Sequence, residues 1–259
     1  MKKAILIGLS FFICALCQSQ PAYDLKRDYT WVFARQWGGN DIPNHDAYKF
    51  IFSDENLRIE EDSFNTTINF ASIGLSDKNG ELILYSHGCA IYGGDNEIII
   101  NGADINQGYF NDVHCPDGII NSGGGILLLP VSDSTYFLIY QRLSRINEIF
   151  ITDLVYYSKI QQLADGQFEV VEKDQILAQD LDLIRGQIAL GRHANGKDWW
   201  LTFISNGNSK LIFLLDENGF NQESEQEIGN RFVRRDGASG STLISPDGTK
   251  MVSYNAYSD

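Results

Sequence analysis

A hairpin pattern that recurs four times along the chain constrains the fold more than any other feature of the sequence. The clearest copy is GQIALGRHANGKDWWLTFIS, residues 186–205, in which two apolar runs flank a turn rich in Asn and Gly. Apolar runs around such a turn predict a β-hairpin. The same pattern surrounds the turns at 77–80, 132–134 and 245–248. Any fold for this chain therefore has to repeat an antiparallel unit.

The spacing of these hairpins indicates four strands per repeat. Equivalent positions just past the turns, Gly80, Thr135, Lys197 and Thr249, are separated by 55, 62 and 52 residues. A four-stranded antiparallel sheet repeated at roughly 40–50 residues or more is typical of β-propeller blades. Runs such as ILLLP and LIFLL do not alternate as a sheet with one wet face would, which favours sheets that are covered on both faces.

We therefore predict an all-β chain folded as a partial β-propeller of the WD40, YVTN or kelch kind. It would have about four to five blades of four antiparallel strands. Short runs at 161–163 and 180–184 hint at helical turns, and residues 101–122 form a long polar insertion of the kind that is usually functional or pinned down. The blade units are predicted near residues 68–100, 124–177, 185–228 and 240–259.

The N-terminus has the order of a secretion signal. Lys2 and Lys3 precede a short apolar run at 4–17, and a polar segment follows at 18–21. This predicts a signal peptide at 1–19 and a propeller domain at 20–259. The run is too short to span a bilayer. We therefore expect an exported protein, extracellular or on the cell surface after passing the periplasm, without membrane insertion.

The formal net charge of the chain is −14 at pH 7. An acidic surface repels phosphate backbones, which argues against nucleic acid as a partner.

Two cysteines, Cys89 and Cys115, remain after the predicted cleavage. An even number of cysteines in an exported protein indicates a disulfide, which here would close a loop of about 27 residues and contribute about 3 kcal/mol. The alternative is a structural zinc site in which His87 and His114 join the two thiols. Neither His–Cys pair has the usual spacer of about two to four residues between zinc ligands.

Calcium is a further open possibility, because oxygen-bearing side chains gather in two short stretches. Asp95, Asn96 and Glu97 lie in one turn, and Asp104 and Asn106 lie close together in the insertion. Solvated turns carry the same residues, and neither stretch has an EF-hand or nonapeptide pattern.

Candidate catalytic motifs are few. The segment around Ser239 lacks the second glycine of a nucleophile elbow. The glycines at 123–125 precede a strand, whereas phosphate binding requires the start of a helix. His193 lies beside the third hairpin turn, where capping the turn is a simpler role than general-base catalysis. No catalytic residue is predicted.

Aromatic residues offer a possible sugar-binding face or, alternatively, packing between sheets. Trp199 and Trp200 are consecutive on one predicted strand and so point to opposite faces. Both are interpreted as packing between blades. The residues that could line a sugar-binding face are Trp31, Trp37, Tyr156 and Tyr157.

Several motifs from about Phe70 onward resemble exported, propeller-like repeat proteins of Bacteroidota, a group whose members often carry a type IX secretion C-terminal sorting domain. The resembling segments are 76–89, 101–109, 114–118, 126–130, 153–160, 192–201 and 245–255. The resemblance implies an extracellular or cell-surface propeller with no established catalytic residues. His87 and His114 depart from the polar residues, such as Asn, expected there. The chain ends at Asp259 inside the fourth unit, so we expect a propeller that is incomplete at its C-terminus.

The expected function is therefore a non-enzymatic binding or scaffold module for a protein or a glycan. The alternative is a secreted hydrolase or lyase acting on polysaccharide, because propellers host glycosidases whose acids lie on different blades. The sequence places a functional site, if this chain carries one, on the loop at 101–122.

Overall fold

The computed structural model describes residues 26–34, 47–53, 55–62, 64, 72–115, 125–205, 208–229, 240–245 and 248–255. Several of the predictions fall outside these residues. They are the signal peptide at 1–19, Trp37, the glycines at 123–124, Ser239 and the side chain of His114.

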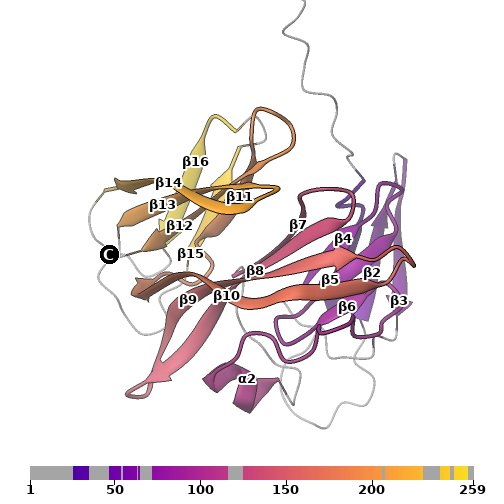
Figure 1. The fold of residues 1–259 in the computed structure, drawn as a ribbon, viewed down its shortest axis with the longest axis horizontal. Helices are drawn as coiled ribbons and strands as arrows, with labels where there is room; N and C mark the ends of the chain where they lie inside the picture. Colours follow the sequence, from indigo (N-terminus) through magenta and orange to yellow (C-terminus); the bar gives the residue numbers. More distant parts are fainter. Residues whose placement is uncertain are drawn as a thin grey trace, which may run out of the picture.

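The all-β prediction is confirmed: in the described residues the strands form five antiparallel sheets, and in each sheet the strands pair in chain order (Figure 1). The first two sheets have three strands each: β1 (Thr30–Ala34), β2 (Ala47–Phe52) and β3 (Leu57–Asp62), then β4 (Ile73–Ser76), β5 (Leu82–Ser86) and β6 (Ile91–Gly93). The third sheet contains β7 (Ile126–Pro130), β8 (Thr135–Ile146), β9 (Ile149–Gln162) and β10 (Phe168–Leu183). The fourth contains β11 (Ile188–Arg192), β12 (Trp199–Ser205), β13 (Ser209–Asp216) and β14 (Gly219–Glu227), and the fifth contains β15 (Gly240–Ile244) and β16 (Met251–Asn255).

Two local expectations were wrong. The run at 180–184 is not helical, because β10 continues to Leu183, which still pairs with Thr152 of β9 after several bulges. Residues 161–162 likewise belong to the end of β9. In the opposite sense, the insertion contains a short helix, α2 (Tyr109–His114), that the sequence did not predict. Only six residues long, α2 is too short to show a helical period.

The hairpin turns repeat one geometry. In three of them a glycine with positive φ donates its N–H to the carbonyl three residues earlier. The bonds run from Gly80 to Asp77 (3.1 Å), from Gly196 to His193 (2.9 Å) and from Gly248 to Ser245 (2.8 Å). A type I turn followed by a left-handed residue matches the twist of the flanking strands, and glycine takes that conformation without strain. The repeated Gly of the sequence pattern is thus explained by backbone geometry.

The first strands of successive sheets lie next to one another. β1 packs beside β4, β4 beside β7, β7 beside β11, and β11 beside β15. Hydrogen bonds reinforce two of these boundaries: the Thr30 N–H donates to Ser76 Oγ (3.0 Å), and the Gly240 N–H donates to the Arg185 carbonyl (2.9 Å). The sheets therefore meet along one line of first strands, with their later strands farther out.

Separate hydrophobic clusters fill the spaces between successive sheets from the first to the fourth. In the third sheet, Leu128 and Leu138 belong to the cluster shared with β4–β6, whereas the next residues along the chain, Leu129 and Ile139, belong to the cluster shared with β11–β14. Successive side chains on a strand point to opposite faces. The unbroken apolar run ILLLP therefore reflects a sheet buried on both faces.

Candidate functional site

A cavity among the described residues lies where the first strands meet. It has a volume of about 560 Å³, within the range of small-ligand sites. Its walls are mostly apolar. It is lined from β1, β4, β7 and β11, with one residue of β12, by Trp31, Val32, Phe33, Ile73, Gly74, Leu75, Leu128, Leu129, Pro130, Leu190, Arg192 and Trp199, together with Arg27, Asp28 and Ser72. We call it the inner-strand cavity.

Two tryptophan side chains, Trp31 and Trp199, form part of the wall of this cavity. Trp199 is anchored because its indole Nε1–H donates to the Pro130 carbonyl at 2.8 Å. Trp31 is 49% exposed, and its ring centroid lies 5.0 Å from that of Phe52. From the sequence, Trp31 was a candidate for either packing or sugar binding, and Trp199 was interpreted as packing between blades. The structure places both in the cavity wall.

Two arginines also reach the cavity, and sequence reasoning missed them. The Arg192 guanidinium lies over the Trp199 ring, 4.1 Å from its centroid. Arg27 precedes β1, and its Nη2 is 3.7 Å from a carboxylate oxygen of exposed Asp133. The signal that could have found Arg192 is its position: it ends a predicted first strand next to the repeated turn.

Trp200, on the opposite face of β12, lines a second cavity of about 350 Å³ between the fourth and fifth sheets. Close to this boundary Lys210 of β13 is buried, and its Nζ contacts Met251 Sδ (2.7 Å) and Ser253 Oγ (3.5 Å) of β16. Burial lowers the pKa of the Lys210 ammonium below its ordinary value. The sequence prediction that Trp199 and Trp200 face opposite sides agrees with this arrangement.

His193 occupies the third hairpin turn. Its Nδ1 accepts a hydrogen bond from the Asn195 N–H at 3.2 Å, and its ring packs 5.1 Å from that of Trp200. These contacts give His193 a turn-capping role. The remaining aromatic candidates lie in packing positions: Tyr156 is buried beside Arg142, and Tyr157 packs against Phe220.

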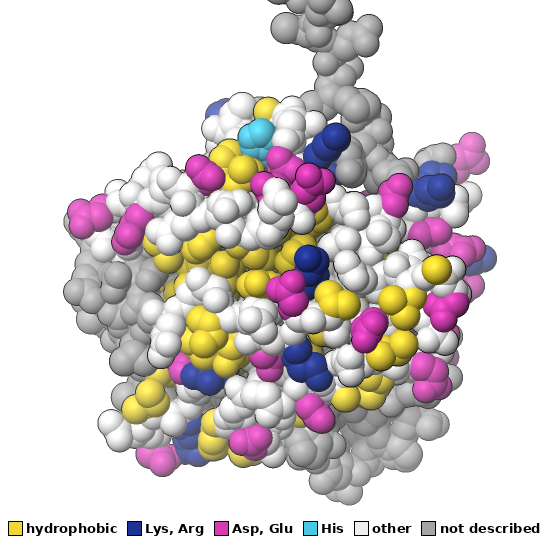
Figure 2. All heavy atoms as spheres, in the orientation of Figure 1, with side chains coloured by type: hydrophobic (Ala, Val, Ile, Leu, Met, Phe, Trp, Pro, Cys, Tyr) yellow, Lys and Arg dark blue, Asp and Glu magenta, His cyan; other side chains and the backbone are white. Residues whose placement is uncertain are grey.

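In the space-filling view, hydrophobic side chains gather near the middle of the face shown, over the region where β7 and β8 run in Figure 1 (Figure 2). Acidic and basic side chains are scattered around this apolar area. The same face therefore combines an apolar centre with a charged rim.

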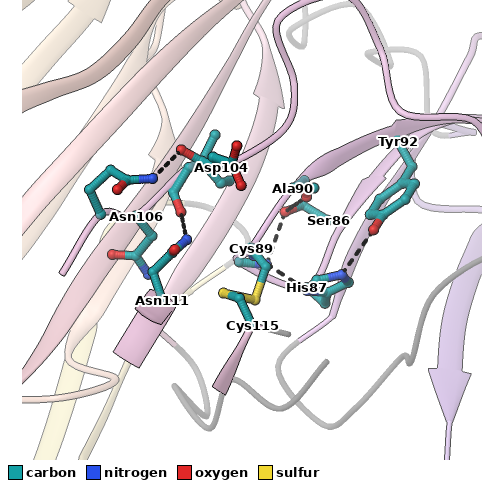
Figure 3. Close-up of a disulfide and its surroundings, with 12 residues drawn as sticks. Ser86, His87, Cys89, Ala90, Tyr92, Asp104, Asn106, Asn111 and Cys115 are labelled. Carbon is teal, nitrogen blue, oxygen red and sulfur yellow. Dashed lines mark hydrogen bonds between the residues drawn. A yellow bond between two sulfur atoms is a disulfide. The ribbon is translucent and has the colours of Figure 1, made fainter. Parts of the chain in front are cut away.

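Neither residue of the cysteine pair lines the inner-strand cavity. Figure 3 shows the pair beside His87. Cys89 and Cys115 are at disulfide distance, with sulfurs 2.12 Å apart, so in this structure each sulfur has the other as its partner. His87 is buried beside them. Its Nδ1 accepts the Cys89 N–H (3.3 Å), which leaves Nε2 of the neutral ring facing the Tyr92 hydroxyl (3.3 Å). Burial lowers the pKa of His87 to about 4.

The predicted insertion is held tightly against the third sheet over its described part, 101–115. The carboxylate of Asp174 in β10 accepts the backbone N–H groups of Asn106 (3.0 Å) and Gln107 (3.3 Å) and also the hydroxyl of Tyr140. Burial, and then the charge of Asp174, raise the pKa of Tyr140. In its described part the insertion is thus pinned by hydrogen bonds as well as by the disulfide.

The calcium candidates serve local turns. Asp95 Oδ1 accepts the Glu97 N–H at 3.1 Å, and the Asp104 carbonyl accepts the Gln107 side-chain amide at 2.8 Å. In the part of the chain that the structure describes, no three His, Cys, Asp or Glu side chains come together as a metal-binding group.

Comparison with known proteins supplied no relative. No protein-family model, curated protein or solved structure matches the chain. Among the described residues, no helix has the length and apolar character needed to cross a membrane.

Proposed function

We propose that this chain is an exported β-propeller module that binds a protein or glycan, without catalysis, at the inner-strand cavity. The observation that carries the proposal is the convergence of four first strands on one apolar cavity with three aromatic and two cationic side chains. In a propeller, the first strands of successive blades line the central channel. The five sheets would then be blades, some of them with fewer than the four strands expected of each.

Two further observations support the proposal. The strands of each sheet pair in chain order, as blade strands do, and the clusters between sheets supply the packing that single blades lack. The disulfide-distance pair supports export, since such bonds persist in oxidising compartments. The basic and apolar order at 1–19 and the resemblance to exported Bacteroidota repeat proteins point the same way, to the cell surface or the extracellular space.

A binding comparison between two exposed apolar sites tests the proposal. The double variant Trp31→Ser/Phe33→Ser removes two cavity residues that are each 49% exposed. Leu243→Ser is the matched control, because Leu243 is 65% exposed and lies outside the cavity. Both variants and the parent are applied to a glycan array and used as bait against surface proteins of the source cell.

We expect the ligand signal to be lost in the cavity variant and kept in the control. Equal binding by all three proteins would contradict a site in the cavity. Turnover of a polysaccharide by the parent protein would replace the binding proposal with the hydrolase or lyase alternative.

A further inference from the structure

The inner-strand cavity combines apolar walls with two arginine side chains. Among its described lining residues, the charged side chains are Arg27, Arg192 and Asp28. The whole chain carries a formal net charge of −14. Two guanidinium groups thus lie at the cavity of an acidic protein, one of them 3.7 Å from the exposed carboxylate of Asp133, and these cationic donors favour an anionic ligand group at this place.

The two arginines are positioned by different contacts. Arg192 ends β11, and its guanidinium plane stacks on Trp199, whose indole is itself fixed to the Pro130 carbonyl. Arg27 has a side chain only 16% exposed, and its one ion pair among the described residues, to Asp133, is long at 3.7 Å. A guanidinium presents a fork of donors that matches a carboxylate, and a stacked guanidinium loses little freedom when it binds one.

The chemistry of the cavity walls favours a peptide ligand over a glycan. A bound sugar needs polar partners for its hydroxyl groups, because a buried hydroxyl without a hydrogen bond is unfavourable. Most of the lining side chains, such as Phe33, Leu128 and Leu190, offer none, whereas they suit aliphatic or aromatic peptide side chains. A volume of about 560 Å³ accommodates a few such side chains but not a folded domain.

We propose that the inner-strand cavity binds a short peptide segment in which an acidic side chain stands beside bulky apolar side chains. The apolar side chains contact the walls formed by β1, β4 and β7, and the carboxylate pairs with Arg192, Arg27 or both. This inference rests on the proposed function and specifies its ligand.

The experiment uses an array of labelled pentapeptides with Trp, Phe or Leu on both sides of a central Glu, and a second array that differs only in a central Gln. Binding to the full chain is measured by fluorescence anisotropy. We expect the Glu peptides to bind about tenfold more tightly than their Gln partners, because a charge-assisted hydrogen bond is about twice as strong as a neutral one.

Three variants assign this difference to the cavity. In at least one of the variants Arg192→Gln and Arg27→Gln, the advantage of Glu over Gln should fall to about twofold or less while the Gln peptides bind as before. Arg145→Gln is the matched control, since Arg145 pairs with Glu148 on the β8–β9 hairpin, outside the cavity. Thermal unfolding of each variant shows whether it is folded.

The outcomes separate this inference from the function on which it rests. Equal binding of Glu and Gln peptides, or an unchanged preference in both cavity arginine variants, would overturn the acidic ligand. If a glycan binds instead and Trp31→Ser/Phe33→Ser abolishes that binding, the peptide is wrong but the cavity function holds. If Trp31→Ser/Phe33→Ser changes no binding at all, both are wrong.

Discussion

The fourth sheet and the fifth are built from similar strands, yet their apolar side chains differ in burial. Leu201 and Phe203 on β12 are fully buried, whereas Leu243 on β15 and Val252 on β16 are 65% and 61% exposed. The β11–β14 sheet packs on the third sheet through one face and contacts the β15–β16 hairpin through β11. The hairpin turns one face toward β11–β14, burying Thr242, and in the described residues its other face is exposed.

A strand that is apolar on both faces is buried only if another sheet packs on each face. The apolar pattern alone does not determine whether both of those sheets are present. Burial at each sheet depends on the sheet stacked against it, as it does in repeat architectures. The same contrast appears at the other end of the row, where Trp31 and Ile59 are about half exposed while Val32 is buried. Stability should therefore be concentrated at the boundaries between sheets.

The largest effect is expected in the cluster between the third and fourth sheets. Phe203→Ala should lower the free energy of unfolding by about 3–5 kcal/mol, because it empties a fully buried site where Phe203 stacks on Phe213 with ring centroids 5.5 Å apart. Urea unfolding followed by tryptophan fluorescence measures the change. A loss below about 1 kcal/mol would mean that this boundary does not hold the structure together.

The stability of the second sheet, whose strands are short, should depend on the Cys89–Cys115 disulfide. Replacing both cysteines, Cys89→Ser with Cys115→Ser, should lower stability by about 3 kcal/mol, since the bond restricts the unfolded chain over a separation of 26 residues. Thermal unfolding is recorded with and without a reducing agent. The double variant is the control, because the agent should destabilise the parent and leave the variant unchanged. A parent protein insensitive to reduction would contradict this prediction.

His87, next to the same sheet, should make the free energy of unfolding depend on pH. The pKa of His87 is about 4 in the folded protein, below its ordinary value of 6.5, so between these pH values the unfolded chain binds the proton more readily. Stability should then rise with pH across that window, by up to about 3 kcal/mol, and level off above it. The measurement is urea unfolding at several pH values. His87→Gln should flatten this part of the profile, and an identical slope in both proteins would refute the assignment to His87.

The smallest effect is expected on the exposed face of the hairpin. Val252→Ser should change the free energy of unfolding by no more than about 0.5 kcal/mol, because the side chain leaves water only slightly on folding. The same urea titration as for Phe203→Ala provides the comparison. A loss of more than about 1 kcal/mol would show that this face is covered in solution, for instance by another copy of the chain.

Much of the fold followed from the sequence because turn and strand signals are local. The turn glycines Gly80 and Gly196 marked hairpins whose strands pair as predicted by the pattern. The arrangement of the sheets relative to one another is a different matter, because it depends on packing between residues far apart in sequence. The extension of β10 to Leu183 escaped prediction for a related reason: its bulges break the alternation that marks a strand.

The candidate site was foreseen only in part. Trp31 and Trp199 stood out as large aromatic residues, but nothing in their spacing of more than a hundred residues showed that they share a wall. Arg27 and Arg192 were missed because an isolated arginine near a turn usually belongs to the solvated surface. What brings these four residues together is the line of first strands, a tertiary feature.

The link between Ile100 and β10 bears on how the molecule responds to force. The Ile100 N–H donates to the Phe168 carbonyl (3.0 Å), and the Val170 N–H donates to the Ile100 carbonyl (2.9 Å). The segment that follows β6 is thus fastened to β10, the outer strand of the third sheet, and β4 and β7 also lie side by side. These two attachments prevent the boundary between the second and third sheets from acting as a hinge. Under mechanical load these two sheets should extend together as one rigid unit, and separation should begin elsewhere.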